Sequence, residues 1–213
     1  MNIPRPYPFR ELFYVSFDGL STLSDLIKIF SRSSSRTHIA TLRNWHGDWP
    51  LIEAWTFDGH WTNTRWGISN FSFHTPGTYY EVWSLKVSVH CAIYCMQEYE
   101  RFAREKRPYD FKALFSFLLY KNKENPVGAM CSEGEVEPLA HFLKWFAVEP
   151  YKVTPQFFIQ LIQAAGARVV TTGVTDGTTN PLQKNAGKGA AISPPGIFKA
   201  AIRHPIKKIL GRQ

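Results

Sequence analysis

Long hydrophobic runs are missing from this chain of 213 residues. No apolar stretch approaches the roughly 20 residues that a transmembrane helix needs, so we predict that the chain does not cross a membrane. The N-terminal segment MNIPRPYPFRELF contains proline and glutamate where a secretory signal peptide has an uninterrupted apolar core. These two absences lead us to expect a cytoplasmic protein, or one delivered by a route that needs no signal peptide.

Cysteine is also scarce, and the chain has only Cys91, Cys95 and Cys131. These three are too few and too unevenly spaced for a disulfide framework. The usual signatures of nucleotide and metal sites are absent, because the sequence has no GxGxxG, no Walker phosphate-binding loop, no HExxH and no paired CxxC. The histidines of the tryptophan-rich segments lack the close spacing of zinc ligands: His46, His60 and His74. We therefore predict neither a cofactor nor a metal.

Basic residues, in contrast, are in excess, with 25 Lys and Arg against 17 Asp and Glu and a formal net charge of +8 at pH 7. Residues 171–213 contain seven of the basic residues and one acid, Asp176, so this tail alone carries +6 and residues 1–170 carry +2. The basic charge therefore indicates what the tail contacts, an anionic membrane or nucleic acid. It gives little support to nucleic-acid binding by the body of the protein.

Composition changes at the same point in the chain. From Thr171 a stretch rich in Gly, Thr, Asn and Pro lacks apolar periodicity, as a flexible linker does. It ends in IFKAAIRHPIKKIL, whose basic residues and isoleucines recur at helical spacing, a pattern typical of an amphipathic helix that binds a membrane surface or a partner. Pro205 interrupts this pattern, so a frayed solubilising tail is the alternative. We place a domain boundary after residue 170, with the tail over 171–213.

Residues 1–170 combine strand patterns with helix patterns. Segments rich in β-branched and aromatic residues, bounded by turn formers, predict strands over 13–19, 37–42, 50–57 and 78–87. Apolar residues at helical spacing predict helices over 23–30, 89–103, 111–120, 131–147 and 155–165. The strands precede most of the helices, which indicates an α+β fold with helices packed on one face of an antiparallel sheet.

Cys131 is the strongest candidate for a reactive side chain, because the segment that follows it, SEGEVEPLAHFLKWF, predicts the start of a helix. A thiol at a helix N-terminus meets the positive end of the helix dipole, which favours the nucleophilic thiolate, and the unpaired N–H groups there can hold an oxyanion. A cysteine nucleophile needs a base, and His38 in the strand segment THIATL would be held rigidly. A structural histidine and a buried structural cysteine are the alternatives. Cys91 and Cys95, four apart on an apolar helix, favour packing over half a metal site.

Glu53 is predicted to orient His38 through the geometry of a hairpin. Segment 37–42 can pair antiparallel with segment 50–57. If the numbers of paired residues add to an odd value, such as 91 or 93, the side chains of His38 and Glu53 lie on the same face of the sheet. A sum of 91 would make them direct neighbours, whereas a slip of one residue would separate them. On a shared face, Glu53 accepts a hydrogen bond from one imidazole nitrogen and directs the other toward sulfur, as in a catalytic triad.

The order of these residues resembles that of the permuted papain-like amidases, circularly permuted relatives of the NlpC-type cell-wall peptidases and of the lecithin retinol acyltransferases. The matching segments are HIATL (38–42), EA (53–54), YD (109–110) and CSE (131–133), and the resemblance covers residues 12–165. It implies a papain-like, circularly permuted α+β fold. It also implies that Cys131 is the nucleophile, His38 the base and Glu53 the orienting residue, with Tyr109 near the site and binding the substrate carbonyl.

The sequence departs from the family pattern at a few positions. Ala40 replaces the usual glycine after the histidine, Arg107 and Pro108 precede Tyr109 where glycine is common, and Gly134 replaces the usual leucine after Cys-Ser-Glu. Pro138 falls inside the helix that follows the nucleophile, where it should kink or restart that helix. These departures concern the geometry of the site more than the fold.

The resemblance implies a cysteine hydrolase or amidase that cleaves an amide or ester bond through an acyl-cysteine, on a cell-wall peptide or an N-acyl or lipid substrate. Tryptophans crowd the sheet region and would suit an acyl chain or a sugar-peptide surface if several line one cleft; the alternative is a packed core. They are Trp45, Trp49, Trp55, Trp61, Trp66 and Trp83. The competing function is a catalytically inert papain-like interaction module whose basic tail binds a membrane or nucleic acid.

Overall fold

Six antiparallel strands carry the fold within the residues that the structure describes. The structure is a computed structural model, and it describes residues 9–20, 24–25, 27–28, 36–43, 49–56, 63–111, 127–143 and 148–177. All of these residues belong to one compact unit. In chain order the strands are β1 (Phe9–Asp18), β2 (His38–Leu42), β3 (Leu51–Thr56), β4 (Thr64–Ser69), β5 (Tyr79–Ser88) and β6 (Arg168–Val174).

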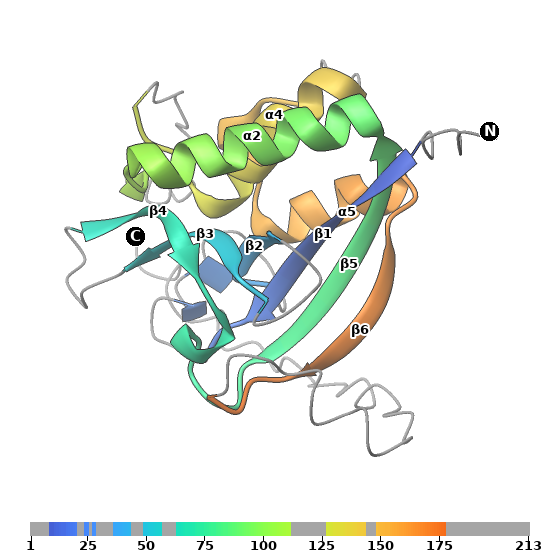
Figure 1. Cartoon of the computed structure of the whole chain (residues 1–213). Helices are drawn as coiled ribbons and strands as arrows, with labels where there is room; N and C mark the ends of the chain where they lie inside the picture. The colour runs from blue at the N-terminus through green and yellow to red at the C-terminus, as the bar shows by residue number, and fades with distance from the viewer. Residues whose placement is uncertain are drawn as a thin grey trace, which may run out of the picture. The chain divides into compact units, whose positions relative to one another are not determined.

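The strands form one sheet in the order β4-β3-β2-β1-β5-β6, and every neighbouring pair is antiparallel. The two ten-residue strands, β1 and β5, are interior neighbours that pair along their whole length, from Phe9 opposite Ser88 to Asp18 opposite Tyr79 (Figure 1). Strand β6 extends the sheet beyond β5, and β4 forms the opposite edge. The α+β class and the antiparallel sheet predicted from the sequence are therefore confirmed.

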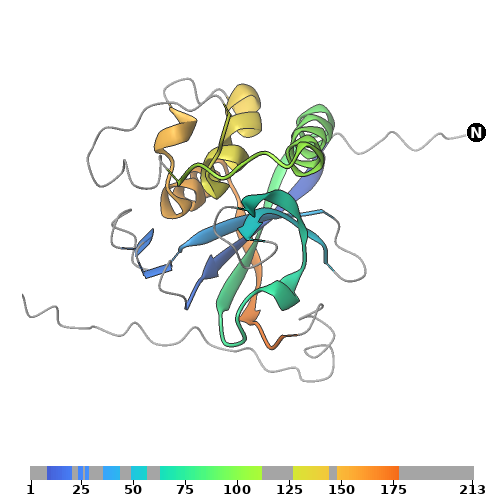
Figure 2. The same ribbon diagram turned by 90° about the vertical axis from the view of Figure 1, so that its left-hand side faces the viewer.

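Helices α2 (Val89–Glu105), α4 (Cys131–Leu143) and α5 (Pro155–Ala164) gather on one side of this curved sheet (Figures 1 and 2). Side-chain oxygens cap two of them, because Ser88 accepts a hydrogen bond from the Cys91 N–H of α2 and Thr154 accepts one from the Phe157 N–H of α5. Two short 3-10 helices, η2 (Phe71–Phe73) and η3 (Pro150–Lys152), complete the named elements. The helix predicted over 111–120 lies outside the described residues except for Phe111.

The core lies between the helices and the sheet face that they cover. Tyr14 of β1, Trp66 of β4 and Phe158 of α5 are all fully buried in it. Burying a side chain of this size stabilises the fold by about 2 kcal/mol before chain entropy is counted. The buried hydroxyl of Tyr14 is not left without a partner, since it lies 3.0 Å from the Tyr99 hydroxyl of α2. The helices are thus fixed on the sheet by aromatic packing, with this hydroxyl pair satisfied inside it.

Strands β4 and β6 are not predicted by the sequence patterns. Segment TRWGIS of β4 mixes charge, glycine and one buried tryptophan, and β6 is largely exposed, so neither shows the alternation of a half-buried strand. Backbone pairing holds β6 in place, from Tyr79 opposite Val174 to Ser84 opposite Arg168. The boundary placed after residue 170 is therefore wrong, because the sheet continues to Val174. The amphipathic helix predicted for the tail lies outside the described residues.

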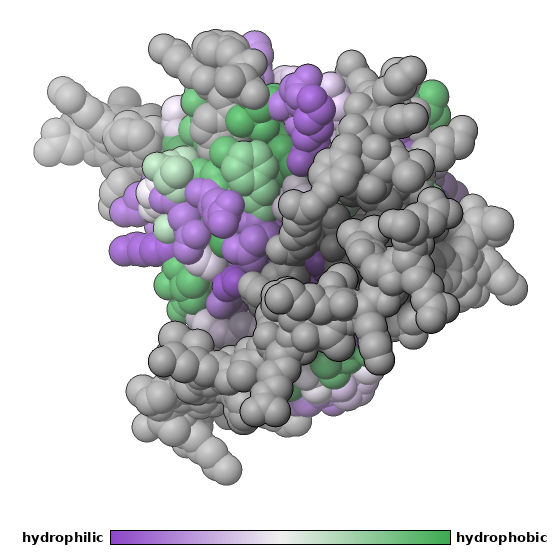
Figure 3. Space-filling model, turned by 180° about the vertical axis from the view of Figure 1, so that it is seen from behind, coloured by the Kyte–Doolittle hydropathy of each residue, from purple (hydrophilic) through white to green (hydrophobic). Residues whose placement is uncertain are grey.

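The surface of the described residues is mixed. Hydrophobic and hydrophilic patches lie side by side on the face seen from behind (Figure 3). None of the helices in the part of the chain that the structure describes is long and apolar enough to cross a membrane.

Candidate active site

The N-terminus of α4 carries Cys131 as its first residue. The side chain of Glu133 turns back to accept a hydrogen bond of 3.0 Å from the Met130 N–H, which is half of a capping box. The first helical hydrogen bond runs from the Gly134 N–H to the Met130 carbonyl, 3.0 Å away. The N–H groups of residues 131–133 therefore precede the helical ladder, at the end of the helix where the dipole is positive.

Gly134 allows this end of α4 to approach the sheet closely. A Cβ atom added to Gly134 would lie 2.2 Å from Cζ2 of Trp66, far inside van der Waals contact. The Trp66 indole also reaches back to the segment before the helix, with Nε1 3.4 Å from the Ala129 carbonyl. A glycine at position 134 is thus required by the tryptophan beneath it. The helix also continues through Pro138 to Leu143 and does not restart there.

His38 and Glu53 meet on the other element of the site, the β2–β3 pair. Thr41 lies opposite Ile52, so paired residue numbers add to 93, the odd register that places His38 and Glu53 on one face. They are diagonal neighbours, because a sum of 93 places position 40 opposite Glu53, two residues along from His38. Nε2 of His38 lies 2.6 Å from Oε2 of Glu53. Since an ionised carboxylate only accepts, this nitrogen carries the proton and Nδ1 is the ring nitrogen left for another partner.

Cys131 lies beside the His38 ring. Burial on its own would lower the pKa of His38, but the charge of the Cys131 sulfur and a hydrogen bond to it, together with the bond and charge of Glu53, raise that pKa to about 10. The site therefore favours the protonated, imidazolium form of His38. Cys131 is only 2% exposed and the His38 side chain 15% exposed, so the pair is largely shielded from solvent. The structure brings together the three residues predicted for the triad.

The carboxylate of Glu53 is fully buried and held at both oxygens. Ser69 of β4 donates a short hydrogen bond to Oε1, and His38 donates to Oε2. Burial on its own would raise the pKa of Glu53, but the charge of His74 and the hydrogen bond from His38 hold it well below its usual range. Glu53 is thus a fixed anion that orients His38.

His74 is a residue of the site that the sequence patterns did not single out. Its Nε2 lies 3.3 Å from Oε2 of Glu53, without the direction of a hydrogen bond. Its ring stacks on Phe17 of β1, with 3.7 Å between ring centroids and 11° between planes. A loop after η2 brings it there, and no local spacing links residue 74 to residue 53. In the sequence, only the residue type of His74, a histidine among aromatic residues, could have indicated that it belongs to the site.

Tyr109 lies near the sulfur, in the segment that follows α2, and Glu133 lies two residues after Cys131 at the start of α4. Burial, followed by the charge of Cys131, raises the pKa of Tyr109 well above its usual value, which puts the phenol beside the nucleophile as expected. Burial also raises the pKa of Glu133 to about 7, while the Met130 N–H and then Arg107 oppose the rise. Tyr109 is thus a neutral donor at neutral pH, close to the sulfur.

Glu135 lies one helical turn below Cys131 and is fully buried. Thr41 donates a short hydrogen bond to its Oε2, while Oε1 has no partner among the described residues. Burial raises the pKa of Glu135 well above its usual value, which favours its protonated form. A second buried carboxyl therefore lies on the helix of Cys131, besides Glu53 of the sheet.

The other candidates serve mainly in packing. Trp49, Trp66 and Trp83 are buried at 2%, 0% and 4% exposure, whereas Trp55 is half-buried with its ring 5.8 Å from that of His38. Trp45 and Trp61 lie outside the described residues, as do His46 and His60. Cys91 and Cys95 are buried with their sulfurs 3.9 Å apart. Among the residues that the structure describes, no group of three His, Cys, Asp or Glu side chains is placed to hold a metal ion.

No family model, curated protein or solved structure matches this chain. Its chemistry must be argued from the site itself. A thiol at a helix N-terminus, an imidazole beside it and a buried carboxylate behind the imidazole are the parts of a nucleophile, a base and an orienting group.

Proposed function

We propose that the protein is a cysteine hydrolase or amidase of the permuted papain-like kind, with Cys131 as nucleophile, His38 as base and Glu53 as orienting residue. The observation that carries the proposal is the contact of Cys131, at the start of α4, with an imidazole whose far nitrogen is bonded to a buried carboxylate at 2.6 Å. A histidine used only in packing would not need both neighbours. The α+β fold, with the nucleophile on a helix and the base on a strand, supports the papain-like assignment.

The reaction follows from the positions of the groups. His38 takes the proton of the Cys131 thiol at Nδ1, and the thiolate forms a bond to the carbonyl carbon of an amide or ester. The carbonyl oxygen becomes an oxyanion that the N–H groups at the start of α4 and the Tyr109 hydroxyl stabilise. His38 returns its proton to the leaving amine or alcohol as the C–N or C–O bond breaks. A water molecule, deprotonated by His38, then releases the acyl group as a carboxylic acid and restores the thiol.

The surroundings of the site favour a substrate with an apolar acyl portion. Trp55 is half-buried and packs near both His38 and His74, with 4.6 Å between the Trp55 and His74 rings. Aromatic side chains of this kind form apolar walls beside a reacting group and exclude water from it. An N-acyl or lipid substrate fits this wall, and a cell-wall peptide is the alternative acyl donor.

Labelling of cysteine tests the proposal directly. We expect iodoacetamide to modify Cys131 faster than Cys91, with a rate that His38→Ala lowers by at least about tenfold because the imidazolium partner of the thiolate is gone. Mass spectrometry of tryptic peptides reads the modification of each cysteine separately, so Cys91 is the internal control. Equal rates at Cys131 and Cys91, or a rate at Cys131 that His38→Ala leaves unchanged, would favour the inert interaction module.

A further inference from the structure

Glu53 projects from the sheet face that lies away from the helix-side core. Phe17 of β1 is the direct partner of His38 across the β1–β2 pair, and the odd register of β2 and β3 puts Glu53 on the same face as His38. Ile39 and Ile52, the neighbours of these two residues in the chain, point to the opposite face and pack in the core beneath the helices. The carboxylate of Glu53 is therefore buried on the second face of the sheet.

Aromatic side chains cover this second face. The ring of Phe17 lies 5.6 Å from that of Phe71, the ring of Phe71 lies 5.0 Å from that of Tyr80, and all three side chains are buried. An ionised carboxylate in apolar surroundings takes up a proton unless nearby groups compensate its charge. The state of Glu53 therefore depends on the polar side chains that reach it.

His74 is the polar side chain that reaches Glu53 from the aromatic side. The stack on Phe17, with 3.7 Å between ring centroids, fixes the imidazole where its Nε2 lies 3.3 Å from Oε2 of Glu53. Burial alone would raise the pKa of Glu53, and among the effects that lower this pKa the charge of His74 comes before the hydrogen bond from His38. The imidazole therefore acts on the carboxylate and does not only fill space.

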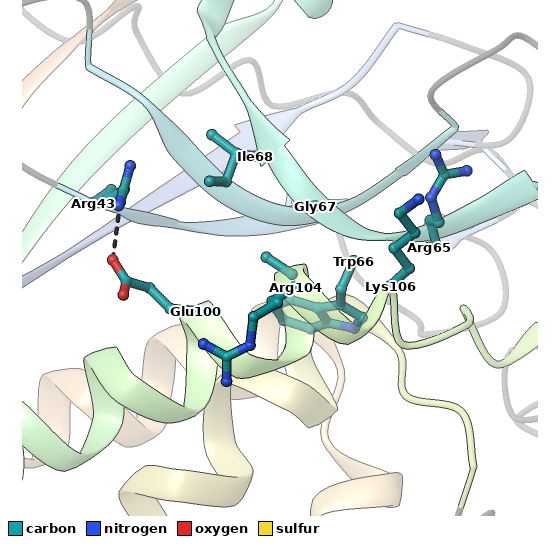
Figure 4. Close-up of a pocket in the computed structure, with 9 residues that line it drawn as sticks. Arg43, Arg65, Trp66, Gly67, Ile68, Glu100, Arg104 and Lys106 are labelled. Carbon is teal, nitrogen blue, oxygen red and sulfur yellow. Dashed lines mark hydrogen bonds and ion pairs between the residues drawn. The ribbon is translucent and has the colours of Figure 1, made fainter.

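A comparison with an exposed ion pair shows why burial matters for this contact. Arg43 and Glu100 lie 2.9 Å apart and line a cleft of about 410 Å³ between β4 and α2, with side chains 44% and 43% exposed (Figure 4). Water screens a pair of this kind, so it contributes little. The side chains of His74 and Glu53 are 4% and 0% exposed, so water screens their interaction far less. A change at His74 should therefore be felt at Glu53.

The loop that carries His74 is fastened to the end of β6. The Thr175 hydroxyl donates a hydrogen bond of 2.6 Å to the Thr75 carbonyl and accepts one of 3.1 Å from the Thr78 N–H. The backbone of Thr175 bonds the same loop twice more, at the Thr78 carbonyl and at the Gly77 N–H. We call these four hydrogen bonds the Thr175 latch. A buried residue just beyond β6, in the stretch whose composition predicts a linker, thus holds the loop after η2.

We propose that His74 is a positioning residue, which holds the carboxylate of Glu53 in line with Nε2 of His38. The stack on Phe17 and the Thr175 latch keep it in place. The inference rests on the proposed function, because the effect on reactivity passes from Glu53 through His38 to the nucleophile. His74 itself gains and loses no proton in the reaction.

Proton NMR of the full chain measures the alignment directly. A proton in a short N–H···O⁻ hydrogen bond resonates far downfield of the amide protons, so the Nε2 proton of His38 has its own resonance, identified by its loss in His38→Ala. His74→Phe keeps a ring against Phe17 but removes the nitrogen near Oε2. We expect the resonance to move upfield and broaden in this variant, because the carboxylate of Glu53 is no longer held. The amide region of the same spectrum shows whether the variant is folded.

Alkylation of Cys131 by iodoacetamide at pH 7 measures the consequence at the nucleophile. We expect His74→Phe to lower the rate about fivefold, less than His38→Ala does, since a misplaced base is still present. His74→Gln puts an amide N–H close to the position of Nε2 and should recover most of the rate and of the downfield shift. The control is His141→Phe, the same change at an exposed position of α4, which should alter neither.

Thr175→Val tests the latch without changing a residue that contacts Glu53. Valine keeps the approximate size of threonine and loses the two hydrogen bonds of the hydroxyl, while the two backbone bonds remain. The resonance of His38 should therefore move in the same direction as in His74→Phe, but by less. An unchanged resonance would show that the latch does not hold His74.

Failure of this inference differs from failure of the proposed function. If Cys131 of the unmodified chain reacts no faster than Cys91, the proposed function fails, and the resonance of His38 alone decides whether His74 aligns Glu53. The inference is overturned if His74→Phe leaves the resonance unchanged, or if His74→Gln recovers no more than His74→Phe does. In either case the histidine serves only in packing.

Discussion

Replacement of Gly134 by alanine tests the packing that positions the nucleophile. The added Cβ would lie 2.2 Å from Cζ2 and 2.8 Å from Cη2 of Trp66. Carbon atoms normally pack at about 3.5 Å or more, so helix and indole must separate by roughly 1.3 Å. Trp66 is fully buried and its ring meets that of Phe102 edge to face at 5.5 Å, so moving the indole disturbs the core packing around it.

Two opposing effects set the size of the change. Alanine stabilises a helix interior by about 1 kcal/mol relative to glycine, whereas overpacking of this kind costs about 3 kcal/mol. We therefore expect Gly134→Ala to lower the free energy of unfolding by about 2 kcal/mol, equivalent to a fall in Tm of roughly 4–8 °C for a unit of this size. A displacement of about 1 Å at Cys131 should also slow its alkylation up to about 100-fold.

Urea unfolding, monitored by tryptophan fluorescence, measures the free energy of unfolding. Two further variants separate the effect of overpacking from that of helix propensity. Ala140→Gly in the same helix reports the helix-propensity difference without the tryptophan. Trp66→Phe replaces the indole by a smaller ring. In that background, Gly134→Ala should be close to neutral and no longer destabilising. If Gly134→Ala instead raises the free energy of unfolding by about 1 kcal/mol in the unaltered background, the close contact with Trp66 does not constrain the helix.

Two further predictions concern pH. The folded pKa of Glu53 is depressed and that of His38 is raised from 6.5 to about 10. Their pairing is therefore fully stabilising between pH 4.5 and 6.5, is lost as the pH rises toward 10, and is lost as the pH falls below 4.5. The difference in unfolding free energy between the unmodified chain and Glu53→Gln should follow that course, and a difference independent of pH would contradict the pairing. Glu135 is a buried acid with a raised pKa, so it destabilises the fold increasingly as the pH rises above 4.5, by about 1.4 kcal/mol per pH unit. Glu135→Gln, which stays neutral, should be more stable than the unmodified chain at pH 7, and urea unfolding at pH 5 and pH 7 would refute this if the gain did not grow with pH.

The sequence patterns predict the elements whose burial has a regular period. Strands β1, β2, β3 and β5 and helices α2, α4 and α5 all lie within or overlap the predicted segments, because each packs one face or one stripe against the core. The sequence patterns do not predict the edge strands β4 and β6, because their side chains are not buried with a regular period. In β6 every residue is exposed or half-buried, and pairing with β5 determines its conformation. Backbone pairing leaves no trace in the side-chain period.

The residues of the candidate site also differ in how well the sequence predicts their positions. The pairing of His38 with Glu53 depends on register within one hairpin, so the parity of residue numbers is enough to place both on a shared face, and the observed sum of 93 agrees. The position of His74 depends on contacts between β1, β3 and the loop after η2, and no spacing of residues in the sequence predicts these contacts. Cys131 is an intermediate case. Its position at a helix start can be inferred locally, whereas its approach to His38 requires the close contact of Gly134 with Trp66, a pair that only the folded chain brings together. Gly134 is therefore matched to Trp66, so a larger residue at position 134 should be better tolerated when residue 66 is made smaller.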